Sequence, residues 1–469
     1  MNDRRLRPAI AAALLFAGSL ALFWPGMVTF DGVFQYRQAL SGVYDDWHPP
    51  AMARLWATLH PLGPGAAPML VLQLAGYWLG FGLLAAGLAR RGRTVAAVAV
   101  LAIALFPPFL GWQGVVLKDA QMTGAMLAAV GLVAFWRLGE RSVPRGAWAA
   151  VALLLGYATL VRANAVFASV PLAVMLAVGP VRWWAKAALL TVGTLAVLAL
   201  APVVNHGVMG AATSGVERTQ ALYDLAGIAV RVPEADDTGL SHAEVRTIRA
   251  RHCVTPFFWD PLGDPDHCDA AVDRLRHLPV GTLYAVLVRA ILHHPLAYAG
   301  HRLAHLNSTE RWLVPAGWIG APPTAWNEPN ELGLAQPGAA ARRWQGLGAL
   351  LVETPFGWPL LWGVVASFGM LALARADQTA SVGLARALFV SALGLEVSFA
   401  AISIASDLRY HLWAMIATAL GVVLAAAELG RERRVLWVGV GALALVMVAG
   451  TTARLLLPIP PASYAGMLG

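Results

Sequence analysis

The sequence has little charge and few residues of the kinds on which a water-exposed surface depends. Only 13% of its 469 residues are charged, and the chain has just two cysteines. This charged fraction is about half that of an ordinary soluble domain, so a soluble fold of this length is excluded. Because 58% of the residues are hydrophobic, disordered, collagenous and disulfide-scaffold proteins are excluded as well. The composition predicts a protein that lies mostly in lipid.

Long apolar segments recur along the chain. A helix satisfies its own backbone hydrogen bonds in lipid and needs roughly 20 apolar residues to cross the hydrocarbon core. We therefore predict an all-α polytopic membrane protein with about eleven transmembrane helices, at 8–27, 66–89, 94–112, 118–136, 147–161, 164–179, 184–205, 356–374, 385–405, 409–428 and 434–456. The fifth and sixth of these spans are short and share a hinge at Arg162-Ala163-Asn164.

Basic residues at the span ends indicate the orientation. Arg and Lys in short loops are retained on the cytoplasmic side of a membrane, and most of them here, such as Arg90, Arg91 and Arg93, fall on the side of the N-terminus. We predict a multi-pass protein of the bacterial inner membrane with a cytoplasmic N-terminus, an external C-terminus and an uncleaved first span. The net charge of +8 then reflects orientation, and no nucleic-acid partner is expected.

One long segment without a predicted span divides the chain. We expect an N-terminal transmembrane module over 1–205, an external, mostly helical periplasmic block over 206–345, and a C-terminal transmembrane module over 346–469. The block holds the cysteines, Cys253 and Cys268. An isolated pair outside the cytoplasm favours a disulfide over two free thiols, and two sulfurs alone form a poor zinc site.

Two further features of the block have structural interpretations. The stretch from Arg289 to His305 contains four histidines without a carboxylate nearby in the sequence. It indicates an amphipathic helix on the membrane surface, with its basic face toward lipid headgroups, rather than a metal site. Several acidic residues among prolines indicate turns, because their spacing does not follow a calcium loop: Asp260, Asp264, Asp266 and Asp269.

The first predicted outer loop carries the most informative polar residues. Asp31 directly follows the apolar residues of the first span, where partial desolvation is expected to raise its basicity and suit it to accept a proton. In a short interfacial helix, Gln35 and Gln38 share its face. The segment Asp45-Asp46-Trp47-His48-Pro49-Pro50 brings further polar groups back to the outer end of the first span. A polar loop that caps a helix is the alternative.

Charged residues also stand at other outer span ends. Lys118 and Asp119 begin one span, and Lys118 is one of only two lysines in the chain. Arg162 interrupts a hydrophobic run, and Asp407-Leu408-Arg409-Tyr410-His411 joins two spans almost without a loop. Ionisable groups at membrane depth are costly and are functional candidates. Lys118, Arg162, Arg409 and His411 are suited to bind a lipid-linked phosphate, whereas a snorkelling lysine and a structural Asp407–Arg409 pair are the alternatives.

These motifs together resemble the GT-C superfamily of integral-membrane glycosyltransferases, which take sugars from polyprenyl-phosphate carriers. The resemblance covers the layout of most of the chain, but in sequence it covers only Asp31 with Tyr36 and Ala39, His48-Pro49-Pro50, Lys118-Asp119 and Arg409-Tyr410. It implies an inverting transferase with a polyprenyl-phosphate-linked sugar donor and a lipid, glycan or protein acceptor.

By the resemblance, each residue has an expected role. Asp31 acts as general base or metal ligand, Asp119 assists, and Lys118, Arg162 and Arg409 neutralise the leaving phosphate. Gly32 follows Asp31 where many family members have a second acidic residue, so Mg²⁺ or Mn²⁺ is a possible cofactor only, with Asp45 or Asp46 as further carboxylates. The remaining candidates for the substrate cavity are Gln35, Tyr36, His48 and Tyr410.

Other classes of membrane protein offer competing functions. A flippase or other transporter of lipid-linked glycans usually has polar sites near the bilayer midplane and repeat symmetry. In this sequence the polar residues gather at the outer ends of the predicted spans, and no repeat is evident. A polysaccharide polymerase or a membrane acyltransferase remains an alternative. An acyltransferase predicts an essential His48, and a glycosyltransferase predicts an essential Asp31.

Overall fold

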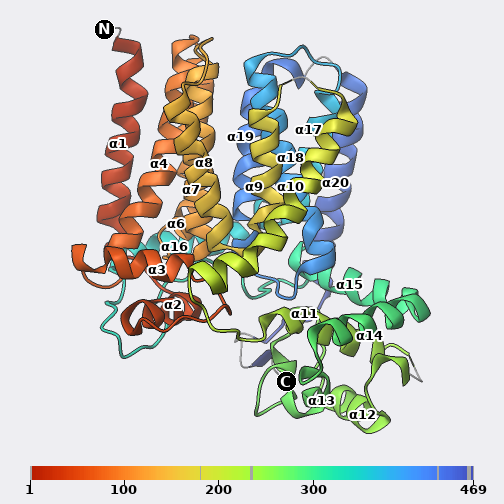
Figure 1. The fold of residues 1–469 in the computed structure, drawn as a ribbon. Helices are drawn as coiled ribbons and strands as arrows, with labels where there is room; N and C mark the ends of the chain where they lie inside the picture. Colours follow the sequence, from red (N-terminus) through yellow and green to blue (C-terminus); the bar gives the residue numbers. More distant parts are fainter. Residues whose placement is uncertain (1–2, 180, 233–235, 430–431, 462–465, 468–469) are drawn as a thin grey trace.

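A computed structural model describes residues 3–179, 181–232, 236–429, 432–461 and 466–467. These residues form helices and isolated β-bridges without a named strand. Figure 1 shows a bundle of long helices with the N-terminus at one end and a smaller block of short helices at the other. The all-α fold class predicted from the sequence is therefore confirmed.

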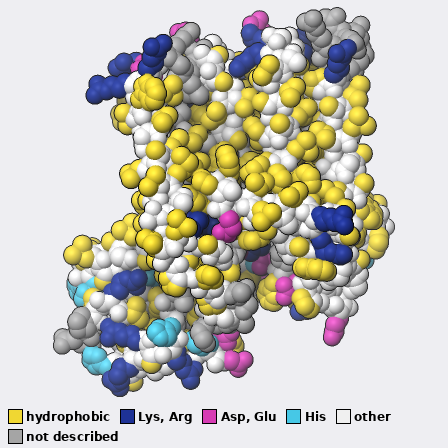
Figure 2. Space-filling view, turned by 180° about the vertical axis from the view of Figure 1, so that it is seen from behind, with side chains coloured by type: hydrophobic (Ala, Val, Ile, Leu, Met, Phe, Trp, Pro, Cys, Tyr) yellow, Lys and Arg dark blue, Asp and Glu magenta, His cyan; other side chains and the backbone are white. Residues whose placement is uncertain are grey.

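The long helices form two groups that stand side by side in Figure 1. The first contains α1 (Asp3–Phe23), α4 (Ala67–Arg90), α7 (Lys118–Arg137) and α8 (Arg145–Val161). The second contains α9 (Val166–Ala177), α10 (Trp183–Pro202), α17 (Pro359–Ala372), α18 (Ala380–Ile402), α19 (Leu412–Leu429) and α20 (Arg433–Leu456). On the face seen in Figure 2, a broad hydrophobic belt lies between two ends that carry Lys and Arg, as expected of a protein in a bilayer.

A helix occurs in each of the eleven predicted segments. Among the described residues, six helices are long and apolar enough to cross a membrane, or up to eight if each of two bent pairs forms one span. The count of eleven crossings therefore stays a prediction. The two short spans are indeed separate helices, α8 and α9, with the short helix η2 (Ala163–Ala165) between them.

The third predicted span is broken rather than continuous. It consists of α5 (Thr94–Ala104) and α6 (Pro107–Gln113), which meet at 58°. Pro107 and Pro108 explain the break, because proline lacks an amide hydrogen and disfavours helical geometry in the residue before it. Phe106 accordingly has an extended backbone conformation.

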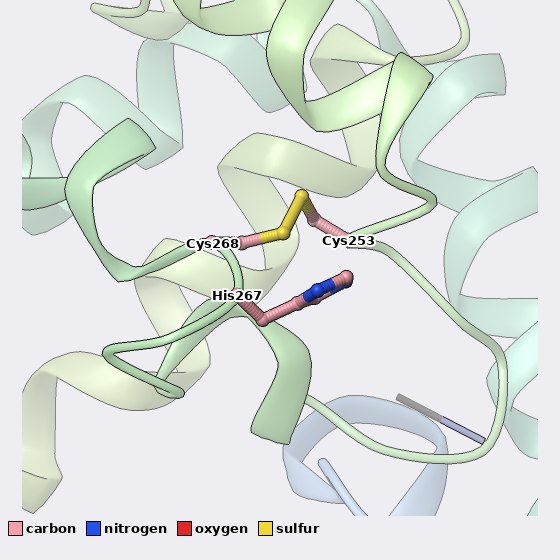
Figure 3. Close-up of side chains that lie close together, drawn as sticks. All are labelled: Cys253, His267 and Cys268. Atoms are coloured by element: carbon pink, nitrogen blue, oxygen red, sulfur yellow. A yellow bond between two sulfur atoms is a disulfide. The ribbon is translucent and has the colours of Figure 1, made fainter. Parts of the chain in front are cut away.

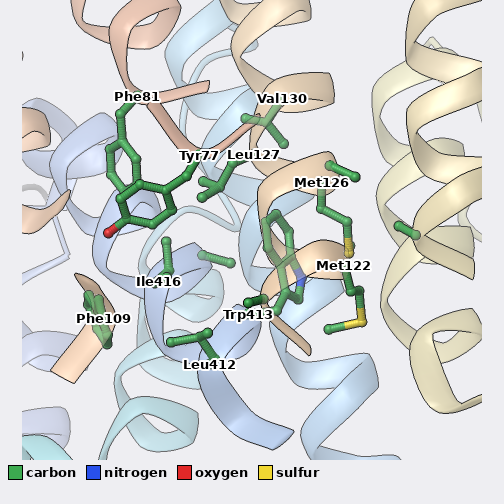
Figure 4. Packing of buried hydrophobic residues seen from close by; sticks show 14 of the residues in the cluster. Tyr77, Phe81, Phe109, Met122, Met126, Leu127, Val130, Leu412, Trp413 and Ile416 are labelled. Atoms are coloured by element: carbon green, nitrogen blue, oxygen red, sulfur yellow. The ribbon is translucent and has the colours of Figure 1, made fainter. Parts of the chain in front are cut away.

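The core of the bundle lies where α4, α7 and α19 meet (Figure 4). Tyr77 of α4 lies beside Leu127 of α7, and the fully buried Trp413 of α19 lies beside Met126. Helices α4 and α7 approach closely through glycines. A Cβ at Gly80 would collide with the backbone of Leu127, and one at Gly131 would lie 2.6 Å from the Gly80 carbonyl oxygen. Small residues allow such approaches between membrane helices.

The end of the bundle opposite the N-terminus carries the first predicted loop and the block (Figure 1). The loop contains α2 (Phe30–Ser41) and α3 (Ala51–Leu59), followed by η1 (His60–Leu62). The block has its own hydrophobic core and contains η3 (Val203–Val208), η4 (Val216–Arg218), α11 (Thr219–Ala229), η5 (Asp236–Thr238), α12 (His242–Ala250), η6 (Asp260–Leu262), η7 (Asp269–Ala271), α13 (Asp273–Arg276), α14 (Val280–His293) and α15 (Pro295–Thr309). Helix α16 (Ala339–Val352) begins before the predicted end of the block at residue 345 and packs on α6. The short helices η8 (Pro355–Gly357) and η9 (Leu408–His411) complete the described elements.

The cysteines of the block are joined. Cys253 and Cys268 form a disulfide with their Cα atoms 6.0 Å apart, and His267 lies beside it (Figure 3). Each sulfur is bonded to the other, so neither is a thiolate that could bind a metal together with His267.

The basic stretch of the block differs from its predicted form. It bends by 105° between α14 and α15, and His301, Arg302 and His305 are buried instead of facing lipid headgroups. Asp224 of α11 explains the difference, because its carboxylate lies 3.2 Å from Arg302 and 3.3 Å from His301. The sequence neighbourhood of the histidines contains no carboxylate, but the fold supplies one from another helix.

The glycine contact between α4 and α7 yields a stability prediction. Gly80→Ala should lower the free energy of unfolding by about 1 to 3 kcal/mol, because the added methyl group overpacks the contact. Gly156→Ala in α8 is the control, since a Cβ there meets nothing within 4 Å. Thermal unfolding of the purified protein in detergent compares the two. An unchanged melting temperature for Gly80→Ala would contradict the close approach.

Candidate functional site

Two separate segments are fixed side by side at the block end of the bundle. Residues Met27 and Val115 form a parallel bridge, in which the Met27 amide donates to the Gly114 carbonyl at 3.1 Å and the Val116 amide to the Met27 carbonyl at 2.7 Å. The Gln73 side chain of α4 donates to the carbonyls of Gln113 and Val115. These bonds place the start of α2 beside the start of α7.

Asp31, in the first turn of α2, lies among basic side chains from three other segments. Its carboxylate is 3.1 Å from the guanidinium of Arg409 in η9, 3.4 Å from the Lys118 ammonium at the start of α7, and 3.6 Å from His48 Nε2 in the loop before α3. All four side chains are at most 17% exposed. Residues 31, 48, 118 and 409 thus converge, and we call them the Asp31 cluster.

His48 connects two members of the Asp31 cluster. The Lys118 ammonium donates a hydrogen bond to His48 Nδ1 at 2.6 Å, so the ring proton is on Nε2, which faces Asp31. Burial and the neighbouring Lys118 lower the pKa of His48, and the ring is therefore neutral at pH 7. With Nδ1 already accepting from Lys118, His48 lacks a free nitrogen to act as a base.

A second ion pair adjoins the Asp31 cluster through an aromatic ring. Arg162 binds the fully buried Asp119 at 2.6 Å and stacks on Tyr410, with 4.2 Å between its Cζ atom and the ring centroid. Arg409 lies over the same ring at 5.3 Å and also binds Asp407 at 2.9 Å. Lys118, Arg162 and Arg409 therefore balance Asp31, Asp119 and Asp407 in charge.

The electrostatics of Asp31 differ from the sequence-based expectation. Burial raises the pKa of this carboxyl, but Arg409, Lys118 and His48 outweigh burial and hold the pKa well below its usual range. The prediction that Asp31 becomes more basic is therefore wrong. Two cations distant in sequence cause the reversal, because opposite charges within a few ångströms favour the ionised form.

Other predicted residues lie around the Asp31 cluster or apart from it. Gln35 is buried on the Asp31 face of α2, whereas Tyr36 packs on Trp56 with ring centroids 4.9 Å apart. Asp46 accepts from the Ser214 amide at 2.6 Å and lies 3.3 Å from His206, and Asp45 accepts from the Trp47 amide.

His411 is also separate from Asp31. It binds Glu396 at 2.7 Å and Thr309 at 3.0 Å. Positions 409 and 411 lie in one 3₁₀ turn, where residues two apart project in different directions. The structure therefore directs Arg409 to Asp31 and His411 to another cluster.

Asp260, which the sequence predicts to be a turn residue, has unusual surroundings in the fold. The Trp259 amide donates to the Ile404 carbonyl at 2.9 Å, which brings η6 close to the segment that precedes Arg409. Burial, Asp407 and Asp31 raise the pKa of Asp260 to about 7. No signal in the sequence identifies this residue, because its acidic neighbours come from other segments.

A pocket of about 270 Å³ lies between the first loop and the block, beside the residue that precedes Asp260. Trp47 and Trp259 both line it and contact each other, with ring centroids 5.9 Å apart. Arg218, Arg276 and Ser214 supply polar groups to its lining. The pocket therefore combines aromatic faces with hydrogen-bond donors, as a polar ligand with apolar ring faces requires.

The surroundings of Asp31 do not fit a divalent metal. Its carboxylate already faces two cationic side chains and a ring nitrogen that carries a proton, whereas Mg²⁺ and Mn²⁺ sites gather several oxygen ligands. Asp119 and Asp407 each bind an arginine, and Asp45 and Asp46 hold the segment around residue 214. No step of the proposed reaction therefore uses a metal at Asp31.

Comparisons with known proteins give similarities at the level of structure only. No family model and no curated protein matches the sequence. The archaeal oligosaccharyltransferase AglB from Archaeoglobus fulgidus, solved with an inhibitory peptide and a dolichol-phosphate, is similar over 96% of this chain at 16% identity and a TM-score of 0.36. This chain spans 55% of the length of AglB.

ArnT from Cupriavidus metallidurans is also similar. Bound to undecaprenyl phosphate, it matches over 91% of this chain and 78% of its own length, at 14% identity and a TM-score of 0.31. Its apo form matches over 90% and 77%, again at 14% identity and 0.31. Because the TM-scores are below 0.5, these similarities assign no family, residue, substrate or activity to this chain.

The Asp31 cluster yields a prediction about charge balance. Asp31→Asn should lower the free energy of unfolding by about 3 kcal/mol, because it leaves buried cations with less compensation. Adding Lys118→Met to the same chain should recover part of that loss. Glu140→Gln is the control, since the Glu140–Arg91 pair is exposed and contributes little. Thermal unfolding in detergent is the measurement, and equal losses in the single and double variants would contradict the pairing.

Proposed function

We propose that this protein is an inverting glycosyltransferase that moves a sugar from a polyprenyl-phosphate carrier to an acceptor hydroxyl at the outer face of the bacterial inner membrane. The observation that carries the proposal is the convergence of Lys118, Arg162 and Arg409 at one end of an apolar helical bundle. A phosphate held on a lipid at that depth needs buried cations, and arginine binds its oxygens through two parallel hydrogen bonds.

In the proposed reaction, the acceptor oxygen attacks the anomeric carbon of the donor from the face opposite the phosphate. The bond between that carbon and the phosphate oxygen breaks, and its electron pair leaves with the polyprenyl phosphate. Lys118, Arg162 and Arg409 stabilise the charge that develops on the phosphate. Since each cation has a carboxylate partner in the free protein, arrival of the donor requires part of these pairs to open.

The proton of the acceptor hydroxyl needs a base. Asp31 stays ionised, but its lowered pKa makes it a weak proton acceptor, so we assign it the role of holding Lys118 and Arg409 in place. Asp260 is better matched, because a general base works best with a pKa near the working pH and that of Asp260 is about 7. The nearby pocket that Trp47 and Trp259 line is our candidate site for the acceptor.

An acyltransferase that uses His48 as its base is less well supported. Such a base needs a ring nitrogen that can take the proton of the acceptor, and Lys118 already donates to Nδ1. Transport of a lipid-linked glycan is kept as an outcome of the experiment below.

Sugar transfer from polyprenyl-phosphate donors by the purified full chain tests the proposed function. Lys118→Gln should lower kcat by about 10²-fold or more, because it removes charge stabilisation of the leaving phosphate. Lys186→Gln is a matched control, since Lys186 is the only other lysine and lies in the first turn of α10, outside the Asp31 cluster. It should leave the rate unchanged.

Two results would contradict the proposed function. Full activity in Lys118→Gln would show that Lys118 does not take part in the reaction. Absence of transfer with every polyprenyl-phosphate sugar, together with movement of such a donor across proteoliposomes, would identify a transporter instead.

The assignment of Asp260 predicts a pH dependence. A base acts in its deprotonated form, so kcat/KM of the wild type should rise as the pH passes through about 7. Asp260→Asn should be slow and lack this rise. Asp266→Asn, an exposed change in the same loop, should keep the wild-type profile. A rise near pH 7 that persists in Asp260→Asn would show that another group takes the proton.

A further inference from the structure

A second cluster of ionisable groups lies outside the Asp31 cluster. Glu310 at the end of α15, Glu396 in α18 and His411 in η9 each offer one ligand atom, and the three atoms lie within 4.8 Å of one another. Each residue is at most 7% exposed. We call these residues the 310/396/411 cluster.

The charges of the 310/396/411 cluster are poorly balanced by protein groups. Among the described residues, neither Glu310 nor Glu396 forms an ion pair with Arg or Lys, and the only basic partner of Glu396 is His411, at 2.7 Å. Arg311, next in the chain, instead binds Glu353 and two backbone carbonyls. Two buried carboxylates without cations are unfavourable, so the cluster favours either a shared proton or a bound cation.

One carboxylate oxygen of the cluster receives no hydrogen bond from a protein N–H group. Glu396 Oε1 is buried and has only the Glu310 carboxyl beside it in the described part of the chain, while Glu396 Oε2 lies beside His411 Nδ1. A buried acceptor of this kind calls for a ligand, because its desolvation is otherwise uncompensated.

One of the two neutral tautomers of His411 orients the imidazole as a metal ligand. Its Nε2 atom lies 3.0 Å from the Thr309 hydroxyl, and the ring packs on Phe399 at 4.6 Å between centroids. If Nε2 donates its hydrogen to Thr309, Nδ1 presents a lone pair to the two carboxylates. Metal-binding histidines usually have the other nitrogen hydrogen-bonded in this manner, which fixes the tautomer and the ring.

We propose that Glu310, Glu396 and His411 bind a divalent transition-metal ion, for which Zn²⁺ is the best match. One imidazole nitrogen and two carboxylate oxygens are a zinc ligand set, at distances of about 2.0 to 2.2 Å. The two negative charges balance the ion, so the buried cluster becomes neutral. The ligands come from the block and from two segments of the bundle, so the ion joins the block to the transmembrane helices.

The metal site also has a consequence for the Asp31 cluster. His411 follows Arg409 and Tyr410 directly, and Arg409 binds Asp31 at 3.1 Å. Fixing His411 fixes the 3₁₀ turn of η9 and with it the direction of Arg409. Glu310, Glu396 and His411 are therefore positioning residues, because they act through Arg409.

Metal analysis of the full chain tests this proposal without any activity assay. The protein is purified in detergent without an affinity tag, loaded with Zn²⁺, and dialysed against metal-free buffer before elemental analysis. We expect roughly one Zn²⁺ per chain in the wild type and loss of most of it in Glu396→Gln and His411→Gln. Glu353→Gln, a carboxylate that binds Arg311, should keep the ion. Equal zinc content in all four proteins, or none in the wild type, would overturn the proposal.

A second measurement covers the case in which the variants fail to fold. Co²⁺ added to the wild-type protein should give visible absorption bands typical of nitrogen and oxygen ligands, and Zn²⁺ should remove them by competition. Zn²⁺ should also raise the melting temperature of the wild type, since it binds only the folded state. Absence of both effects would indicate that the two carboxyl groups share a proton instead. None of these results depends on the proposed transferase activity.

Discussion

The structure at the block end of the bundle depends on compensating buried charge with charge. Asp31 is nearly enclosed, and its ionised form is stable there only because Lys118 and Arg409 lie within 3.4 Å of its carboxylate. Each of these cations comes from a different segment, so the ion pairs also fix α2, the start of α7 and η9 relative to one another. An unpaired charge at this depth would cost several kcal/mol, which makes the arrangement specific.

The same requirement explains the polar contacts elsewhere at this end. Asp119 binds Arg162, and Asp224 binds Arg302 and His301 inside the block. In each case the partners are distant in sequence, so the ion pairs connect elements as well as neutralise them. The 310/396/411 cluster departs from this pattern, because its two carboxylates share one histidine. That departure is the reason for assigning a metal ion to it.

The proposed chemistry follows from the division of roles among carboxylates. A carboxylate between two cations keeps its charge and positions them, whereas a carboxylate near other acidic groups holds its proton more tightly. Asp31 and Asp260 represent these two cases. Groups whose surroundings shift their pKa values in opposite directions are typical of acid–base sites, and here Asp31 lies beside cations suited to a lipid phosphate.

The sequence by itself determined the all-α class, the positions of the apolar helices and the identity of the charged residues that the bundle cannot leave in lipid. These properties are local, because hydrophobic length and the cost of a lone charge are read from neighbouring residues. Only the tertiary structure decided the partners: it lowered the pKa of Asp31, raised that of Asp260, buried His301 and separated His411 from Arg409. The physical reason is that Coulomb interactions depend on distance in space, and these partners are far apart in sequence.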